Sequence, residues 1–166
     1  MTYIFRKLNC PSPSINLELK SNLPEEIKEW AFWLSSGLLG EEKLPLCPWA
    51  KKSILEESVD YYENQEPERL VPLPKGIKVR IVSFPEKSHQ EIIEIRNRCN
   101  KTFNDWVFLD SHPDDEGNIG GIRSVYKSPL LLIQSRKELE EARKILQSGK
   151  YYSYWDPSTL KEILSL

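Results

Sequence analysis

Cysteine and histidine are both scarce in this sequence, and this scarcity excludes several kinds of site. The 166 residues contain three cysteines and two histidines. The cysteines (Cys10, Cys47 and Cys99) are too far apart for a CxxC zinc pattern, and their odd number does not form a disulfide framework. We therefore expect three reduced thiols, with Cys99 packed as a small apolar side chain on the inner face of a helix.

Long runs of basic or apolar residues are also missing. The formal net charge is -2 at pH 7, and no cluster of Lys and Arg indicates a protein whose main role is to bind the phosphates of nucleic acid. No apolar segment approaches the roughly 20 residues of a membrane-spanning helix, and the first residues lack the apolar region of a secretory signal. We therefore expect a cytoplasmic protein with no nucleic-acid partner and no membrane partner.

The length of 166 residues and an ordinary composition, with 39% hydrophobic and 29% charged residues, predict a single globular domain over 1–166. Residues 77–84 (IKVRIVSF) and 106–111 (WVFLDS) predict two strands. Between them, residues 88–99 predict a helix that begins with a Ser-x-x-Glu capping box and carries apolar residues on one face. Two strands joined by a helix in this way predict a βαβ unit with parallel strands and a right-handed crossover.

Other segments predict the elements around this unit. Residues 129–134 (PLLLIQ) predict a third apolar strand. Helices are predicted after Asn22, after Ser135 and after Asp156, and a short helix is predicted around 54–62. We therefore expect an α/β fold, with α+β as the alternative, in which a small mixed sheet with a central parallel βαβ unit is flanked by three or four helices. The segment from Glu41 to Gly76, rich in proline and charge, is the least predictable.

Both predicted strands of the βαβ unit are followed by a histidine. FPEKSH, which ends in His89, follows the first strand, and SHPDDEGNIGG, which contains His112, follows the second. Because ligands gather beyond the carboxyl ends of parallel strands, we expect the two histidines at one edge of the sheet. Imidazoles and carboxylates are ligands of divalent metals. We therefore predict one zinc or iron ion bound by His112, Asp115 and His89, with Asp114 as the base that takes a proton from metal-bound water.

Small and basic residues just beyond this loop predict contacts to a small-molecule substrate. Gly120 and Gly121 would let backbone N–H groups approach the substrate closely, and Arg123 would add a positive charge. The glycine run lacks both GxGxxG and a Walker lysine, so a flexible loop is the alternative. Likewise, HPDDEG could be a solvated acidic turn, and His89 could be a surface residue at the start of a helix.

The string HPDDE after an apolar strand resembles the zinc signature of the N-acetylglucosaminyl deacetylases, which act on N-acetylglucosaminyl lipids and on related thiol precursors. In that family the histidine and the second aspartate bind zinc and the first aspartate is the base. The resemblance therefore implies these roles for His112, Asp115 and Asp114. The family supplies a further zinc-binding histidine downstream, but no histidine follows His112 here, so His89 would have to take that place.

A second resemblance spans more of the chain. A tryptophan-containing helix near the N-terminus, the string LCPWA (46–50), His112-Pro113 and Ser128-Pro129 are similar to a small bacterial family of unknown function. That family is recognised by Leu-Cys-Pro-Phe-Ala and by a downstream His-Pro and Ser-Pro. The resemblance implies no reaction, but it suggests that Cys47 and His112 belong to one site.

Three functions are compatible with these features. The leading one is a metal-dependent hydrolase that acts on a small polar substrate. The alternative is a non-catalytic binding or interaction module, in which the acidic loop and the aromatic cluster at 151–155 contact a protein partner. The third is a cysteine-based enzyme with Cys47 as the nucleophile and His112 as its base, although Cys47 could equally be a buried thiol beside Trp49.

Overall fold

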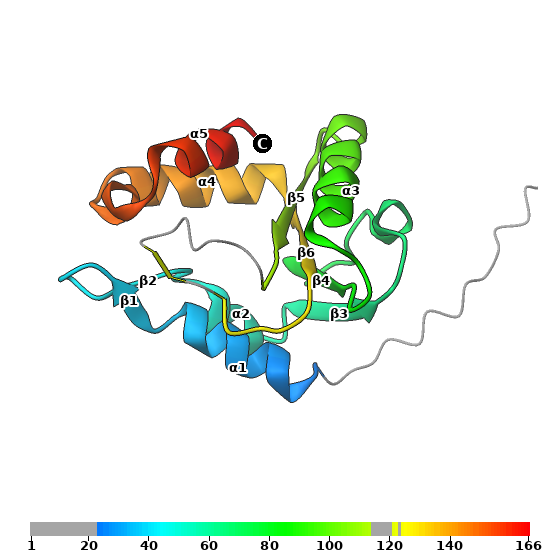
Figure 1. Cartoon of the computed structure of the whole chain (residues 1–166), viewed down its shortest axis with the longest axis horizontal. Helices are drawn as coiled ribbons and strands as arrows, with labels where there is room; N and C mark the ends of the chain where they lie inside the picture. The colour runs from blue at the N-terminus through cyan, green and yellow to red at the C-terminus, as the bar shows by residue number, and fades with distance from the viewer. Residues whose placement is uncertain (1–22, 114–120, 123) are drawn as a thin grey trace, which may run out of the picture.

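The computed structural model describes residues 23–113, 121–122 and 124–166, which form an α/β fold, as the sequence predicts (Figure 1). The described α-helices are α1 (Glu25–Leu34), α2 (Ala50–Leu55), α3 (His89–Thr102), α4 (Arg136–Gln147) and α5 (Pro157–Ser165). The strands are β1 (Gly37–Leu39), β2 (Leu44–Pro45), β3 (Val59–Glu63), β4 (Val79–Ser83), β5 (Trp106–Ser111) and β6 (Leu130–Ser135). Two short 3-10 helices complete the described elements: η1 (Pro67–Leu70) and η2 (Tyr151–Tyr154).

The main sheet has four strands in the order β3-β4-β6-β5, and this order corrects one part of the predicted βαβ unit. The strands β4 and β5 were expected to be hydrogen-bonded neighbours, but β6 lies between them and is antiparallel to both. They still run in the same direction, and the parallel pair is β3 with β4. The reason is burial: Leu130, Leu131 and Ile133 of β6 are each 0% exposed, and a strand that is apolar on both faces belongs inside a sheet.

The segment predicted as a helix around 54–62 is divided between two elements. The helix α2 ends at Leu55, and Glu57 has a φ of 52°, which is incompatible with a continuing helix. The strand β3 follows because Val59, Tyr61 and Tyr62 favour extended backbone and pair in register with β4. The prediction of a helix here was wrong because a local pattern does not show that a strand partner is available.

Capping residues predicted from the sequence begin three of the helices. Ser88 and Glu91 form the complete capping box of α3. Ser135 accepts a hydrogen bond from the backbone N–H of Glu138 at the start of α4, and the Asp156 carboxylate accepts two backbone N–H groups at the start of α5. These local signals therefore fix where the helices that cover the sheet begin.

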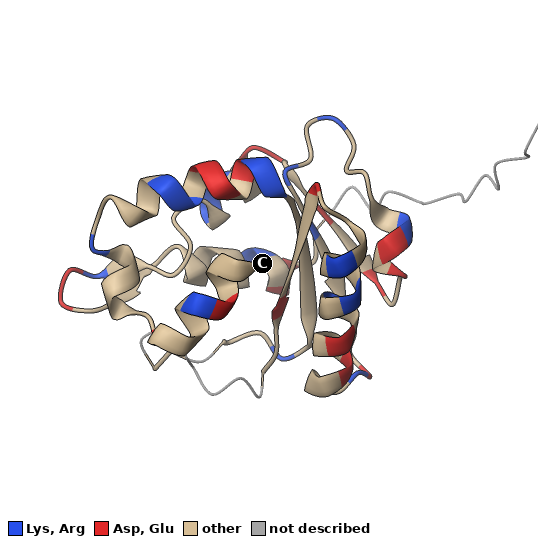
Figure 2. Ribbon diagram, turned by 90° about the horizontal axis from the view of Figure 1, so that it is seen from above, with Lys and Arg blue, Asp and Glu red and all other residues tan. Residues whose placement is uncertain are grey.

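Helices cover both faces of the main sheet (Figure 1). One face packs against α3, in a core that contains Val82, Ile92, Phe108 and Ile133. The other face packs against α1, where Ile27 and Trp30 contact Ile81 and Leu130. A third apolar cluster joins β1 and β2 to η2. Basic and acidic residues both occur along α3 and α4 (Figure 2), and none of the described helices has the length and apolar character needed to cross a bilayer.

A buried ion pair joins the edge strand β3 to β4. The Nη2 atom of Arg80 lies 2.6 Å from Oδ2 of Asp60, and the side chains are only 5% and 7% exposed. The Arg80 guanidinium also donates to the carbonyl oxygen of Leu70 and lies 4.8 Å from the centre of the Tyr62 ring. Because each of these charges would be costly to bury alone, removal of either partner is expected to destabilise the docking of β3 on β4.

Candidate functional site

The two histidines meet at one edge of the main sheet, as the sequence predicts. The carboxyl ends of β4 and β5 lie on either side of Leu130, the first residue of β6. His112 directly follows β5, and His89 is the first residue of α3, which follows β4. Their imidazole rings stack with centroids 4.7 Å apart and planes 18° apart. His112 is 5% exposed, so its environment is set by the protein rather than by bulk water.

A charged network supports this pair of histidines. The Asp110 carboxylate of β5 lies 3.5 Å from Nε2 of His89 and accepts a 2.7 Å hydrogen bond from Arg96 of α3. Arg96 also pairs with Glu162 of α5 at 2.8 Å. Neither Asp110 nor Arg96 was predicted from the sequence. The sequence did contain a signal for Arg96. Its position between Ile92 and Cys99 places it on the inward face of the helix, where an arginine needs a partner for its charge.

Several predicted site residues lie outside the described residues. These are the base Asp114, the metal ligand Asp115, and the substrate-binding residues Gly120 and Arg123. Gly121 is described and has a φ of 73°, in the region that favours glycine. Within 23–113, 121–122 and 124–166, no three His, Cys, Asp or Glu side chains are grouped so that they could hold a metal ion. The ligand set of His112, Asp115 and His89 therefore stays a prediction.

A large cavity separates the sheet from the helices α2 and α4 and has a volume of about 590 Å³. We call it the interlayer cavity. On the sheet side, the cavity is lined by Ile81, Leu109 and Leu132, which lie on one face of the sheet. Its aromatic lining comes from Trp30, Trp33, Trp49, Tyr151, Tyr152 and Trp155, and the polar or reactive groups along it include Cys47, Asp110, Ser124, His112 and Arg143. Cys47 and His112 therefore line one cavity, although they are 65 positions apart in the sequence.

Cys47 lies at the turn that leads into α2. Its backbone N–H donates to Leu34 O at 2.8 Å, and its carbonyl oxygen accepts from the Ser35 hydroxyl. Burial raises the pKa of the Cys47 thiol, and nearby backbone N–H groups of Trp49 and Ala50 only partly oppose this. The nucleophilic form of cysteine is the thiolate, so this environment does not favour Cys47 as a nucleophile in the resting protein.

We expect slow alkylation of Cys47. At pH 7 its reaction with iodoacetamide should be about tenfold or more slower than that of an unfolded cysteine, and the rate should rise as the pH passes 9, because burial raises the pKa. Mass spectrometry of the alkylated peptides measures each thiol separately. Cys99 is 0% exposed and its pKa is raised to about 12 by burial, so it should react more slowly still. Fast labelling of Cys47 at mildly acidic pH, slowed by His112→Ala, would instead support cysteine chemistry.

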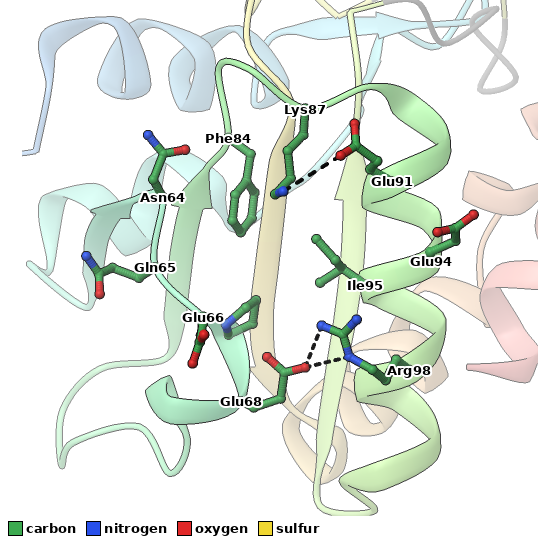
Figure 3. Close-up of a pocket in the computed structure, with 11 residues that line it drawn as sticks. Asn64, Gln65, Glu66, Glu68, Phe84, Lys87, Glu91, Glu94, Ile95 and Arg98 are labelled. Atoms are coloured by element: carbon green, nitrogen blue, oxygen red, sulfur yellow. Dashed lines mark hydrogen bonds and ion pairs between the residues drawn. The ribbon is translucent and has the colours of Figure 1, made fainter.

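A second hollow lies on the α3 side of the sheet, between η1 and α3 (Figure 3). Its volume is about 480 Å³, and four glutamates line it. Each of them has a partner: Arg69 for Glu66, Arg98 for Glu68, Lys87 for Glu91 and Gln90 for Glu94. The acidic side chains are thus engaged in surface ion pairs and hydrogen bonds, so none of these four carboxylates is left unpaired for a cationic ligand.

Arg143 is a further candidate residue that was not predicted from the sequence. It lies on α4 beside Leu139, Ala142 and Leu146, which form the inward stripe of the helix, and it lines the interlayer cavity with them. The sequence did contain a signal for it: Arg143 comes four positions after Leu139 and therefore lies next to the apolar stripe on the helix surface. An arginine can also reach solvent from such a position, so the sequence does not show that this one is buried.

Comparisons with models of protein families, with curated proteins and with solved structures found no match. The two resemblances noted in the sequence therefore rest on the short motifs that carry them. The function has to be argued from the geometry of the site itself.

Proposed function

We propose that this protein binds a small organic molecule in the interlayer cavity, with an apolar part of the ligand against the aromatic wall and a polar part near His112. The observation that carries this proposal is the cavity itself, about 590 Å³ in volume and lined by tryptophan and tyrosine rings from three segments of the chain. Small-molecule sites in proteins are commonly cavities of about 300–1,000 Å³ with apolar walls and few polar groups. This proposal differs from the non-catalytic alternative of the sequence analysis, in which the acidic loop and the aromatic cluster at 151–155 contact a partner.

The five tryptophans provide a test of the proposal with an internal control. Trp30, Trp33, Trp49 and Trp155 line the cavity, whereas Trp106 packs on the α3 side of the sheet. Addition of 1-naphthol, a neutral apolar probe, to protein labelled with ¹⁵N at the indoles should shift the signals of the four cavity tryptophans and leave that of Trp106 in place. If none of the four signals moves at millimolar probe, or if only the Trp106 signal moves, the proposal is wrong.

Metal-dependent hydrolysis is a second proposal for the same edge of the sheet. It is supported by the stacking of His89 on His112, which brings two of the three predicted ligands side by side. The nearby Asp110 carboxylate, 3.5 Å from His89, is engaged by Arg96 and is not one of the predicted ligands. A bound zinc or iron ion would lower the pKa of a ligated water and so supply a nucleophile. Ring nitrogens bind metals in the plane of the ring. Because the two planes are nearly parallel, one ring would have to turn before both could bind one ion.

This second proposal predicts about one zinc or iron ion per chain in protein purified without a histidine tag. His112→Ala should abolish the bound metal, measured by plasma mass spectrometry, because it removes a predicted ligand. His89→Ala should lower the metal content as well. Protein that contains no metal, and whose melting temperature does not respond to added divalent ions, would contradict metal-dependent hydrolysis and leave binding of an organic molecule as the function.

A further inference from the structure

Arg143 places a buried positive charge in the wall of the interlayer cavity. It belongs to α4 and is only 8% exposed. Its neighbours on the helix face that lines the cavity are Glu138, Leu139, Ala142 and Leu146, so this face carries three apolar side chains and one carboxylate, and that carboxylate forms no ion pair with Arg143. Arginine is seldom buried unless another group compensates its charge. A buried arginine at this position should therefore have a partner that compensates its charge.

The protein supplies little of that compensation. One guanidinium nitrogen, Nη2, donates a 2.7 Å hydrogen bond to the carbonyl oxygen of Ile163 in α5. No carboxylate among the described residues forms an ion pair with Arg143. A guanidinium has five N–H donors in a planar fork, so most of its hydrogen-bonding capacity is unused by the residues that the structure describes. The buried Arg80, in contrast, has the Asp60 carboxylate as its partner.

A second group near this end of the cavity also lacks a partner. The indole Nε1 of Trp155 is buried and has no hydrogen-bond acceptor within the described part of the chain. Trp155 contacts Tyr151 and Tyr152 by ring packing, and all three line the cavity with Arg143. The hydroxyl of Tyr152 lies near enough to Arg143 for the guanidinium to influence its pKa. This nitrogen has almost no accessible surface, so a ligand in the cavity would contact the Trp155 ring and not its N–H group, and Arg143 is the donor that a ligand could reach at this end.

We infer that the ligand of the interlayer cavity is an oxyanion with an apolar body, bound by Arg143 through its carboxylate or phosphate group. This inference rests on the proposed function and specifies its ligand class. The planar guanidinium matches the two oxygens of a carboxylate or a phosphate, and such charge-assisted pairs are stronger than neutral hydrogen bonds. The aromatic and aliphatic wall accommodates the rest of the molecule.

Three probes with one ring system test the inference. They are 1-naphthol, 1-naphthoate and 1-naphthyl phosphate, which share the apolar body and differ in the group that Arg143 would bind. Their dissociation constants are measured by NMR titration of the full chain at fixed salt. In the wild-type protein we expect at least one of the two anions to bind about tenfold or more tightly than the neutral naphthol. The ratio between the anions then distinguishes a carboxylate ligand from a phosphate ligand.

Two substitutions on α4 assign the preference to one residue. Arg143→Gln should remove the advantage of the anions, so that the ratio of the dissociation constants of 1-naphthol and each anion falls to about one; the dispersion of the indole signals shows whether the variant is folded. Lys144→Gln removes the same charge from the adjacent, exposed position of the helix and should leave the preference for anions unchanged. Arg143→Lys, which keeps the charge but loses the fork, should retain only part of the preference.

The outcomes separate this inference from the proposal on which it rests. If 1-naphthol and both anions fail to bind, the cavity is not a ligand site and both ideas are wrong. If 1-naphthol binds, but neither anion binds more tightly in the wild type, only the inference is wrong. The inference is also wrong if Arg143→Gln weakens all three probes equally, or if Lys144→Gln has the same effect as Arg143→Gln.

Discussion

The Ala142→Trp variant is expected to lose the binding of 1-naphthol, with the dissociation constant raised on the order of 100-fold or beyond detection. Ala142 lies on the face of α4 that lines the interlayer cavity, so an indole at this position would occupy the space that the probe needs. Filling an empty apolar cavity commonly raises stability by about 0.5–2 kcal/mol. The variant should therefore lose binding while its melting temperature stays the same or rises, which separates a blocked site from a misfolded protein.

Ile145→Trp is the matched control for this experiment. Ile145 lies on the same helix but is 64% exposed, and it does not contribute to the cavity. The same large ring added there should leave the affinity for 1-naphthol at the wild-type value. If Ala142→Trp binds the probe as tightly as the wild type and shows the same indole shifts, the probe does not occupy the interlayer cavity. The proposed location of the site would then have to be abandoned.

Replacement of Asp60 by alanine is expected to lower the free energy of unfolding by about 3–5 kcal/mol, the range found when one partner of a buried ion pair is removed. Arg80 is 4% exposed and would keep its charge among the buried residues of β4, with only the Leu70 carbonyl and the Tyr62 ring beside it. A loss of this size is a large share of the stability of an ordinary domain. Urea unfolding followed by circular dichroism measures it.

Two controls show whether the loss comes from the unpaired charge. The double replacement Asp60→Leu with Arg80→Met removes both charges and should recover most of the stability, because apolar side chains can replace a buried ion pair. Glu56→Ala removes a carboxylate that pairs with Lys78 at 3.2 Å on the surface and should lower the stability far less than Asp60→Ala, because exposed ion pairs contribute little. If Asp60→Ala costs as little as Glu56→Ala, the buried pair does not hold β3 in place.

Local signals in the sequence predicted most of the individual elements of the fold. Capping side chains and apolar stripes correctly indicated α3, α4 and α5, because these signals act within one or two turns of a helix. The order of the strands was not predictable in the same way. The apolar character of residues 130–135 shows that β6 is buried on both faces, but it does not show which strands lie beside it. The strand β3 was missed because its main stabilising contact is with β4, about 20 positions away.

The candidate site could be predicted only in part, for a similar reason. The meeting of His89 and His112 followed from the shared direction of β4 and β5, which does not require that the strands be adjacent. The interlayer cavity is formed by segments from α1 to α5 and has no counterpart in any short motif. The partial pairing of Arg143 is a property of the folded chain, because the sequence does not specify which carboxylates will lie near a guanidinium.

The position of β6 has a consequence for how the protein is made. Among the four strands of the main sheet, β6 is the last to leave the ribosome, yet both β4 and β5 depend on it for backbone hydrogen bonds. Until Ser135 has emerged, β5 has no strand beside it among those that the structure describes, and β4 is paired only with β3. The nascent chain thus carries open strand edges from the emergence of β4 until the emergence of β6, and such edges are prone to pair with other molecules. The four-stranded sheet therefore cannot form before β6 is available to join the β3–β4 pair to β5.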